Sequence, residues 1–348
     1  MNSFFIEYRD PLFSVIIFFV FVFIITFISY WWGRYRADRD IKHLDKFLKQ
    51  FHTIPSSDEI KVLVKNGDLS EKSWLILAKA YSDAGEYEKS IEIYTELLKL
   101  EDNKNSKQIL FLFGTTYFKA GFLQRAKTVF LEILKKNPRT PEALQYLLLV
   151  YEQMRDYQSA CDVLAPLKEL KEDVGTQDSY IKAMIVLNDS KLSSVDKVKS
   201  LIDIYNATNT NTHLIFEYLF KIDPKIAWQT FDVSKCEEVV DILWLIDTKD
   251  LDLDIITRNN YLRELYTARG DLNLAKSSDI FEFDILINLN SKANATLSFE
   301  YVCDNCKQVS PFAFGRCMKC HSVDSSNIEI SLVKDYHRNF SEENNSFQ

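Results

Sequence analysis

The chain has 348 residues, of which 47% are hydrophobic, so it can bury a sizeable core over most of its length. Its 42 Lys and Arg residues are outnumbered by 50 Asp and Glu residues, which gives a formal net charge of −8 at pH 7. This acidic balance, with no clustered basic stripe, argues against a general nucleic-acid-binding protein.

An uncharged segment near the N-terminus predicts a membrane anchor. Residues 11–33 carry no charge and are rich in Phe, Ile and Val. At about 1.5 Å per helical residue they are long enough to cross a hydrocarbon layer of about 30 Å. A cleaved signal peptide would have a basic N-terminal region and a shorter apolar stretch, whereas Glu7, Arg9 and Asp10 precede this one. We therefore expect an uncleaved transmembrane helix after a short non-cytoplasmic N-terminus, residues 1–10.

Aromatic and then basic residues follow the predicted span. Tyr30, Trp31 and Trp32 suit the headgroup region of the bilayer. Four basic side chains come next: Arg34, Arg36, Arg39 and Lys42. Because positive flanks stay on the cytoplasmic side, we expect a single-pass protein with its C-terminal bulk in the cytoplasm.

The sequence pattern of residues 34–69 predicts a charged juxtamembrane helix followed by a linker. Apolar side chains recur at helical spacing from Ile41 to Phe51. Pro55, Ser56 and Ser57 then interrupt the pattern. This segment is interpreted as a spacer between the anchor and the rest of the chain.

Three consecutive windows after this break share one pattern of aromatic, small and glycine residues. The first window has Trp74, Leu77, Ala78, Tyr81, Gly85, Tyr87, Ser90 and Tyr94. The series recurs at Leu110, Phe113, Gly114, Tyr117, Gly121, Leu123, Ala126, Phe130 and Pro138, and again at Leu144, Leu147, Leu148, Tyr151, Tyr157, Ala160 and Leu164. This is the 34-residue tetratricopeptide pattern, in which small residues let two helices approach and aromatic residues fill the gap to the next repeat.

The sequence therefore predicts a mainly α fold, a helical solenoid over residues 70–290. Clear repeats are expected at about 71–104, 107–140 and 141–174, and residues 175–255 are interpreted as degenerate repeats. A last unit at about 256–289 is indicated by Leu262, Tyr266, Gly270, Leu272 and Ala275. Such stacks leave an extended concave face, so we expect protein clients to bind there.

Four cysteines carry the most specific motif in the chain. Cys303, Cys306, Cys317 and Cys320 form C-x2-C-x10-C-x2-C, the spacing at which two hairpins close around one tetrahedral metal ion. In a reducing cytoplasm these thiols are metal ligands rather than disulfides. Four thiolates leave no open coordination position, so we predict one structural zinc ion, with iron as the alternative metal. The predicted unit is a small β zinc ribbon over 298–334, followed by a disordered tail over 335–348.

We predict no metal-binding role for the other cysteines and histidines. Cys161 and Cys236 stand alone in helical patterns and are expected to be core thiols. His321 follows Cys320 directly but is expected to be a bystander, because four thiolates already complete the site. The remaining histidines form no i, i+4 pair and predict no second metal site: His43, His52, His213 and His337.

Two aromatic residues lie between the cysteine pairs. Phe312 and Phe314, with Arg316 and Lys319 nearby, could contact a nucleic acid, as some ribbons do. The alternative is that they dock the ribbon onto the repeats. We favour docking, because two aromatic and two cationic side chains make a small footprint on an acidic chain.

The order of anchor, tetratricopeptide repeats and terminal ribbon resembles the lipopolysaccharide assembly protein B family of Gram-negative bacteria. Tyr301 adds to the match, because the family has an aromatic residue two positions before the first cysteine. The resemblance implies that Cys303, Cys306, Cys317 and Cys320 are the metal ligands of a rubredoxin-type ribbon. Lys307 and His321 depart from the glycine that many zinc knuckles place after the second cysteine of a pair.

The same resemblance implies an inner-membrane regulator of lipopolysaccharide biosynthesis. Such a protein would present the lipid A pathway deacetylase to the FtsH protease, and its anchor would respond to a membrane-embedded regulator. The sequence has no Gly-rich phosphate loop, no Ser-His-Asp order and no recognisable carboxylate pair, so we expect no enzyme. Two alternatives remain: a generic tetratricopeptide scaffold for another envelope machine, and a rubredoxin-like iron electron carrier.

Overall fold

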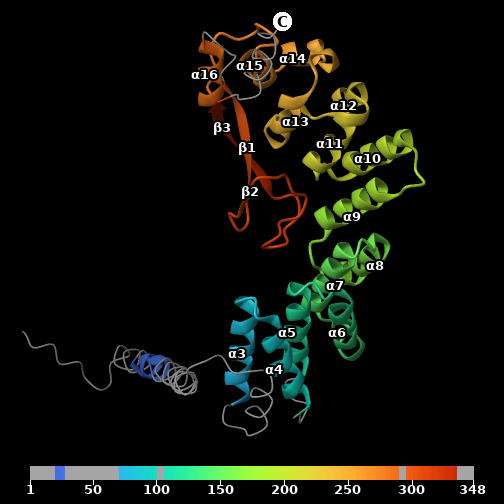
Figure 1. Ribbon diagram of the computed structural model, residues 1–348, viewed down its shortest axis with the longest axis vertical. Coiled ribbons are helices and arrows are strands. Elements are labelled where there is room, and N and C mark those ends of the chain that lie inside the picture. Colours follow the sequence, from blue (N-terminus) through green and yellow to red (C-terminus); the bar gives the residue numbers. More distant parts are fainter. Residues whose placement is uncertain (1–19, 28–69, 100–105, 290–294, 335–348) are drawn as a thin grey trace, which may run out of the picture. The chain divides into compact units, whose positions relative to one another are not determined.

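The computed structural model describes residues 20–27, 70–99, 106–289 and 295–334 (Figure 1). The chain divides into two compact units, Met1–Val150 and Tyr151–Gln348. Most of the predicted anchor, residues 11–33, lies outside the described residues, although residues 20–27 are helical. Within the described ranges no helix is both long enough and apolar enough to cross a membrane. The predicted N-terminus (1–10), juxtamembrane segment (34–69) and tail (335–348) also lie outside them.

The first unit is built from helices joined in pairs. They are α3 (Glu71–Asp83), α4 (Tyr87–Lys99), α5 (Ser106–Lys119), α6 (Leu123–Lys136) and most of α7 (Pro141–Gln153). Ser70 begins the series, because its hydroxyl caps α3 by accepting the backbone N–H of Ser73 at 3.2 Å. Helices α3 and α4 fall within the window 71–104, and α5 and α6 match the window 107–140 except that α5 begins one residue earlier, at Ser106.

The turns within these helix pairs have one backbone geometry. Gly85 and Gly121 have φ values of 85° and 78°, a left-handed conformation that side chains other than glycine rarely adopt. The residue after each glycine donates its N–H to a tyrosine carbonyl one turn back, Glu86 to Tyr81 and Phe122 to Tyr117, each at 2.9 Å. These bonds satisfy carbonyls that the end of a helix would otherwise leave open.

Small residues permit the close approach of the helices in each pair. Ala78 and Ala126 are fully buried. A Cβ atom on Gly114 would lie 2.8 Å from Cε1 of Phe130, so only glycine fits between α5 and α6. Trp74 and Tyr94 fill the core of the first pair. The small-residue positions of the sequence pattern thus have the packing role expected of them.

The second unit continues with helices and ends in a sheet. Its helices are α8 (Tyr157–Glu169), α9 (Gly175–Asn188), α10 (Ser194–Thr208), α11 (Thr212–Ile222), α12 (Pro224–Thr230), η1 (Val233–Val239), α13 (Val240–Leu245), η2 (Thr248–Asp250), α14 (Leu253–Arg258), α15 (Asn260–Arg269) and α16 (Phe281–Asn288). Helix pairs persist through α12, although the sequence signature fades after residue 175. From α12 onward, however, the elements have at most ten residues, fewer than any of the helices α3–α11.

The structure differs from the complete repeat expected at about 256–289. Gly270 ends α15 in the left-handed conformation, with φ 92°, as a repeat turn requires. Residues 270–280 are not helical, however, and the next helix begins only at Phe281. The hydroxyl of Thr267 accepts the N–H groups of Leu274 and Ala275 at 3.1 and 3.2 Å, which holds this segment in an irregular path.

A three-stranded antiparallel sheet follows, with strand order β2-β1-β3. Strands β1 (Ala295–Cys303) and β3 (Ser326–Lys334) pair along their whole length, and β2 (Val309–Ser310) is short. Leu297, Tyr301 and Ile328 are buried in the same core cluster as the side chains of α9–α16. The sheet is therefore part of the core of the second unit rather than an independent module.

Candidate metal centre

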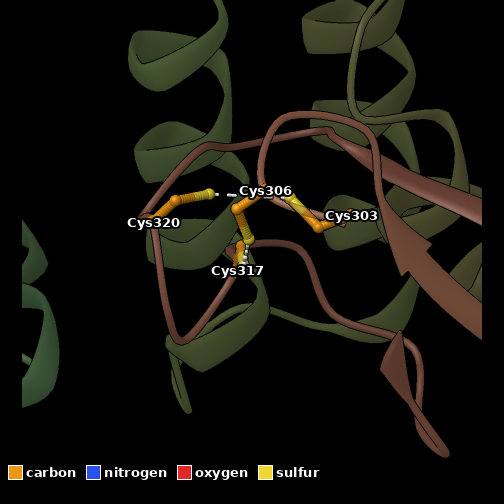
Figure 2. A group of neighbouring side chains, drawn as sticks. All are labelled: Cys303, Cys306, Cys317 and Cys320. Atoms are coloured by element: carbon orange, nitrogen blue, oxygen red, sulfur yellow. Dashed lines mark hydrogen bonds between the residues drawn. The ribbon is translucent and has the colours of Figure 1, made fainter. Parts of the chain in front are cut away.

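The four predicted ligands come together at the end of this sheet. Cys303 ends β1, Cys306 follows in the adjoining turn, and Cys317 and Cys320 lie on the second turn (Figure 2). All four sulfur atoms lie within 4.8 Å of one another. The sulfurs of Cys303 and Cys320 are 3.6 Å apart, as are those of Cys306 and Cys317. All four thiols are free.

Two turns with matching hydrogen bonds hold the cysteines. In the first, the N–H of Cys303 bonds to the carbonyl of Gln308 and the N–H of Lys307 to the carbonyl of Cys303, at 3.0 and 2.8 Å. In the second, Cys317 bonds to Ser322 and His321 to Cys317 in the same way, both at 2.9 Å. Each C-x2-C segment is thus folded back by its own backbone, which aims both thiols at one point.

This sulfur cluster fits a tetrahedral metal ion. Zinc–sulfur bonds of about 2.3 Å imply sulfur–sulfur separations of about 3.8 Å in a tetrahedron. The two 3.6 Å pairs are close to this value, and no pair of sulfurs is more than 4.8 Å apart. Burial raises the pKa of the Cys303 thiol, but hydrogen bonds with Ser325 and with the backbone of Cys306 and Asn305 outweigh it and lower the pKa to about 6. The four cysteines can hold a metal ion, and a closed set of four thiolates would give it a structural role.

We expect the purified protein to be colourless and to contain one zinc ion per chain. Zinc has a filled d shell and absorbs no visible light when four thiolates bind it. Elemental analysis and an absorption spectrum of protein from iron-replete cells measure both properties. Visible absorption bands with one iron per chain would instead establish the iron alternative.

His321 is not one of the four grouped ligands. Its backbone has φ 62°, and Lys307 holds the equivalent position in the first turn with φ 55°. Burial and the neighbouring Arg316 lower the pKa of the imidazole. Because their φ values are positive, Lys307 and His321 both occupy left-handed positions at which glycine is favoured.

Replacing Lys307 or His321 with glycine should stabilise the metal-bound ribbon. A side chain in the left-handed conformation costs about 1 kcal/mol, which glycine avoids, so we expect each change to raise the free energy of unfolding by about 0.5–1 kcal/mol. Lys319→Gly is the matched control, because Lys319 lies in the same turn with negative φ and should lose stability. Thermal unfolding measures all three. A loss of stability in K307G and H321G would contradict the prediction.

A buried ion pair fastens the second cysteine turn to a distant helix. Nε of Arg316 donates to Oε2 of Glu152, at the end of α7, at 2.7 Å. The two side chains are 9% and 13% exposed. Tyr180 of α9 donates its hydroxyl to the other oxygen of Glu152 at 3.0 Å, and Arg316 lies over the Tyr180 ring at 5.2 Å. Nη1 of Arg316 also donates to the carbonyl of His321 at 2.7 Å.

The aromatic residues between the cysteine pairs have different surroundings. Phe314 packs against the core of the second unit, as the docking interpretation requires. Phe312 is 77% exposed. The cation thought to flank them, Arg316, is the buried partner of Glu152. Sequence reasoning missed this role, because Glu152 lies 164 residues away and no local pattern connects the two.

Gly315→Ala should separate the ribbon from α9. A Cβ atom at this position would lie 2.7 Å from Cε2 of Tyr180, whose ring is held in place by Glu152 and Arg316. Overpacking of this kind costs about 1–3 kcal/mol. Denaturant unfolding measures the loss. Tyr180→Ala in the same chain is the control, because removing the ring should make Gly315→Ala nearly neutral; an equal loss in that background would contradict the argument.

A second buried polar cluster joins β1 to the helices. Oδ2 of Asp241 accepts a hydrogen bond from the Tyr301 hydroxyl at 2.7 Å and pairs with Nε2 of His213 at 2.8 Å. Burial raises the pKa of Asp241, but these bonds outweigh it and hold the pKa below its usual value. His213, which appeared isolated in the sequence, thus has an acidic partner in α13. Tyr301, first noted through a family resemblance, is its link to the sheet.

Comparison with known proteins identifies the helical part of the chain. The family described as "Tetratricopeptide repeat" matches residues 71–104, the first helix pair. Photosystem I assembly protein Ycf3 of Prochlorococcus marinus (strain NATL1A) is 30% identical over 128 residues, which covers 34% of this chain and 73% of that protein. Regulatory protein RapD of Bacillus subtilis (strain 168) is 26% identical over 173 residues, 46% of this chain and 44% of RapD.

A solved structure is also similar in part. MamA 41-end from Desulfovibrio magneticus RS-1 covers 54% of this chain and 98% of its own, at 18% identity and a TM-score of 0.36. The stronger result is the sequence match to Ycf3, which extends over most of that protein and agrees with the repeat family found at 71–104. The chain belongs to the tetratricopeptide-repeat proteins.

Proposed function

We propose that this protein is a membrane-anchored adaptor that regulates lipopolysaccharide biosynthesis. Tetratricopeptide-repeat proteins act as scaffolds by binding other proteins, and the names of two relatives, an assembly protein and a regulatory protein, agree with such a role. The observation that carries the proposal is the four-cysteine ribbon packed into the core of the repeat-derived helices. A closed metal site in that place supports a binding surface and offers no open position for catalysis.

In its specific form, the adaptor presents the lipid A pathway deacetylase to an FtsH-type protease. The anchor places it in the bacterial inner membrane with a single pass and its bulk in the cytoplasm, and a membrane-embedded regulator contacts the anchor. The protein has no catalytic activity of its own. Support comes from the order of apolar segment, repeats and ribbon in the sequence, and from Tyr301 before the first cysteine.

Affinity capture from crosslinked membranes tests this proposal. The full-length chain is compared with one that lacks residues 1–33, and both are scored for envelope enzymes and proteases by mass spectrometry. We expect the deacetylase and the protease with the full-length chain, and a several-fold lower yield without the anchor. Recovery of neither protein would overturn the specific role. Reporters fused after Lys42 test the topology, and a signal outside the inner membrane would overturn the placement.

A further inference from the structure

A cleft of about 840 Å³ lies beside the buried Asp241 cluster in the second unit. Its walls come from α11, α13, η2 and the loop before the second cysteine turn. Apolar side chains line part of it, among them Phe312 and Leu245, each 77% exposed. The cleft therefore offers apolar surface that the fold itself leaves uncovered.

The polar lining of this cleft is mostly acidic. Glu217, Asp241, Asp247 and Asp250 contribute four carboxyl groups, against Lys221 and Lys249. Lys249 is already paired with Asp247 at 3.1 Å. An adjoining cleft of about 350 Å³ shares Glu217 and adds Glu237, Glu238, Asp304 and Asp324, against Lys235 alone. Together the two clefts form an acidic groove that would attract a cationic ligand.

Within the described ranges, one carboxylate oxygen in the wall of this groove lacks a hydrogen-bond partner. Asp241 is 6% exposed, and its Oδ2 is used by Tyr301 and His213. Its Oδ1 has no hydrogen-bond partner among the described residues, although it is buried. A buried carboxylate oxygen without a donor is costly. A ligand that brings an N–H donor into the cleft would remove this cost.

We infer that the groove binds an extended protein segment in which a lysine or arginine side chain lies next to apolar ones. The cationic side chain of the segment pairs with Glu217 at the surface and with Asp241 in the wall of the groove. The neighbouring apolar side chains of the segment cover Phe312 and Leu245. Charge complementarity selects this class of segment over an acidic one. The inference rests on the proposed adaptor function and names the chemistry of the client segment.

Fluorescence anisotropy with the full-length chain tests this inference. The probe is a labelled eight-residue peptide that alternates Leu with Lys, and the matched peptide has Glu in place of Lys. We expect saturable binding of the Lys peptide, weakened at least tenfold by Glu217→Lys and by Phe312→Ala, and no binding of the Glu peptide. Asp203→Lys is the control, because Asp203 is exposed on α10, lies outside the groove and changes the net charge equally. It should bind the Lys peptide like the wild type.

Equal affinity for wild type, E217K and D203K would show attraction by net charge alone and would overturn the inference. So would the absence of saturable binding. A concentration-dependent dimer that E217K disrupts, without peptide binding, would assign the groove to a second copy of the chain and would also overturn it. If the peptide fails to bind while membrane capture still recovers the deacetylase and the protease, the adaptor function stands and only the groove assignment falls.

Discussion

Replacing Cys303 and Cys306 with serine should abolish the predicted metal binding and destabilise the whole second unit, not only the ribbon. Metal binding by four thiolates contributes about 10 kcal/mol or more to folding in small zinc domains. In this chain the strand that ends at Cys303 also supplies Leu297 and Tyr301 to the core shared with α9–α16. Loss of the metal should therefore also destabilise those helices. The free energy of unfolding of the second unit should fall by several kcal/mol.

Hydrogen exchange read by mass spectrometry measures the extent of this loss. Amide protection should decrease in α11, α13 and α15, and it should be retained in α3–α6 of the first unit. Cys161→Ser is the matched control, because this half-buried thiol on α8 is not part of the metal cluster. Wild-type protection throughout residues 212–288 in the double variant would contradict a structural role for the metal.

The helix pairs and the cysteine turns could be predicted because their determinants are local. Ala78 and Gly114 hold the same repeat position 36 residues apart, and Ser90 and Ala126 hold another position at the same spacing. This spacing brings each small residue to a helix crossing. The two C-x2-C segments likewise carry their own turn geometry. Sequence distance is short in both cases, so periodicity and motif spacing contain the needed information.

The failure at 256–289 has a similar local explanation. Gly270 correctly signalled the end of a helix, but a turn signal does not guarantee that another helix follows. Thr267 accepts two backbone N–H groups from the next segment, and Arg269 donates to the carbonyls of Trp244 and Ile246 at 2.6 and 2.7 Å. These tertiary bonds override the weak helix propensity of residues 271–280.

Contacts between distant residues could not be predicted from one sequence. Asp241 and Tyr301 are 60 residues apart, and their hydrogen bond forms because β1 packs into the same core as the helices. Arg316 looked like a surface cation of the ribbon, whereas its environment is set by a helix that precedes it by more than a hundred residues. Burial and pairing of such groups depend on topology, which periodicity does not specify.

Breaking the Arg316–Glu152 pair by removing either partner should cost the second unit about 3–5 kcal/mol. Glu152→Leu leaves the guanidinium of Arg316 buried without its carboxylate, and Arg316→Met leaves the carboxylate with only the Tyr180 hydroxyl. Burial raises the pKa of Glu152, and Arg316 only partly opposes this. A group whose pKa is raised on folding contributes stability below its unfolded pKa and loses it as the pH rises through the folded pKa. Near neutral pH, the ionised carboxylate of Glu152 therefore lowers the free energy of unfolding.

The double variant E152L/R316M tests whether the loss in each single variant comes from a buried charge without a partner. With both charges gone, no buried ion lacks a partner, so the loss should be much smaller than the sum of the two single losses. Denaturant unfolding of the four proteins at pH 7 gives the coupling energy. Lys182→Met on α9 is the control, because its ion pair with Asp178 is half exposed and should contribute less than about 1 kcal/mol. Additive losses in the double variant would mean that Arg316 and Glu152 stabilise the second unit independently, and the pair would then not be the link between the cysteine turn and the first residues of this unit.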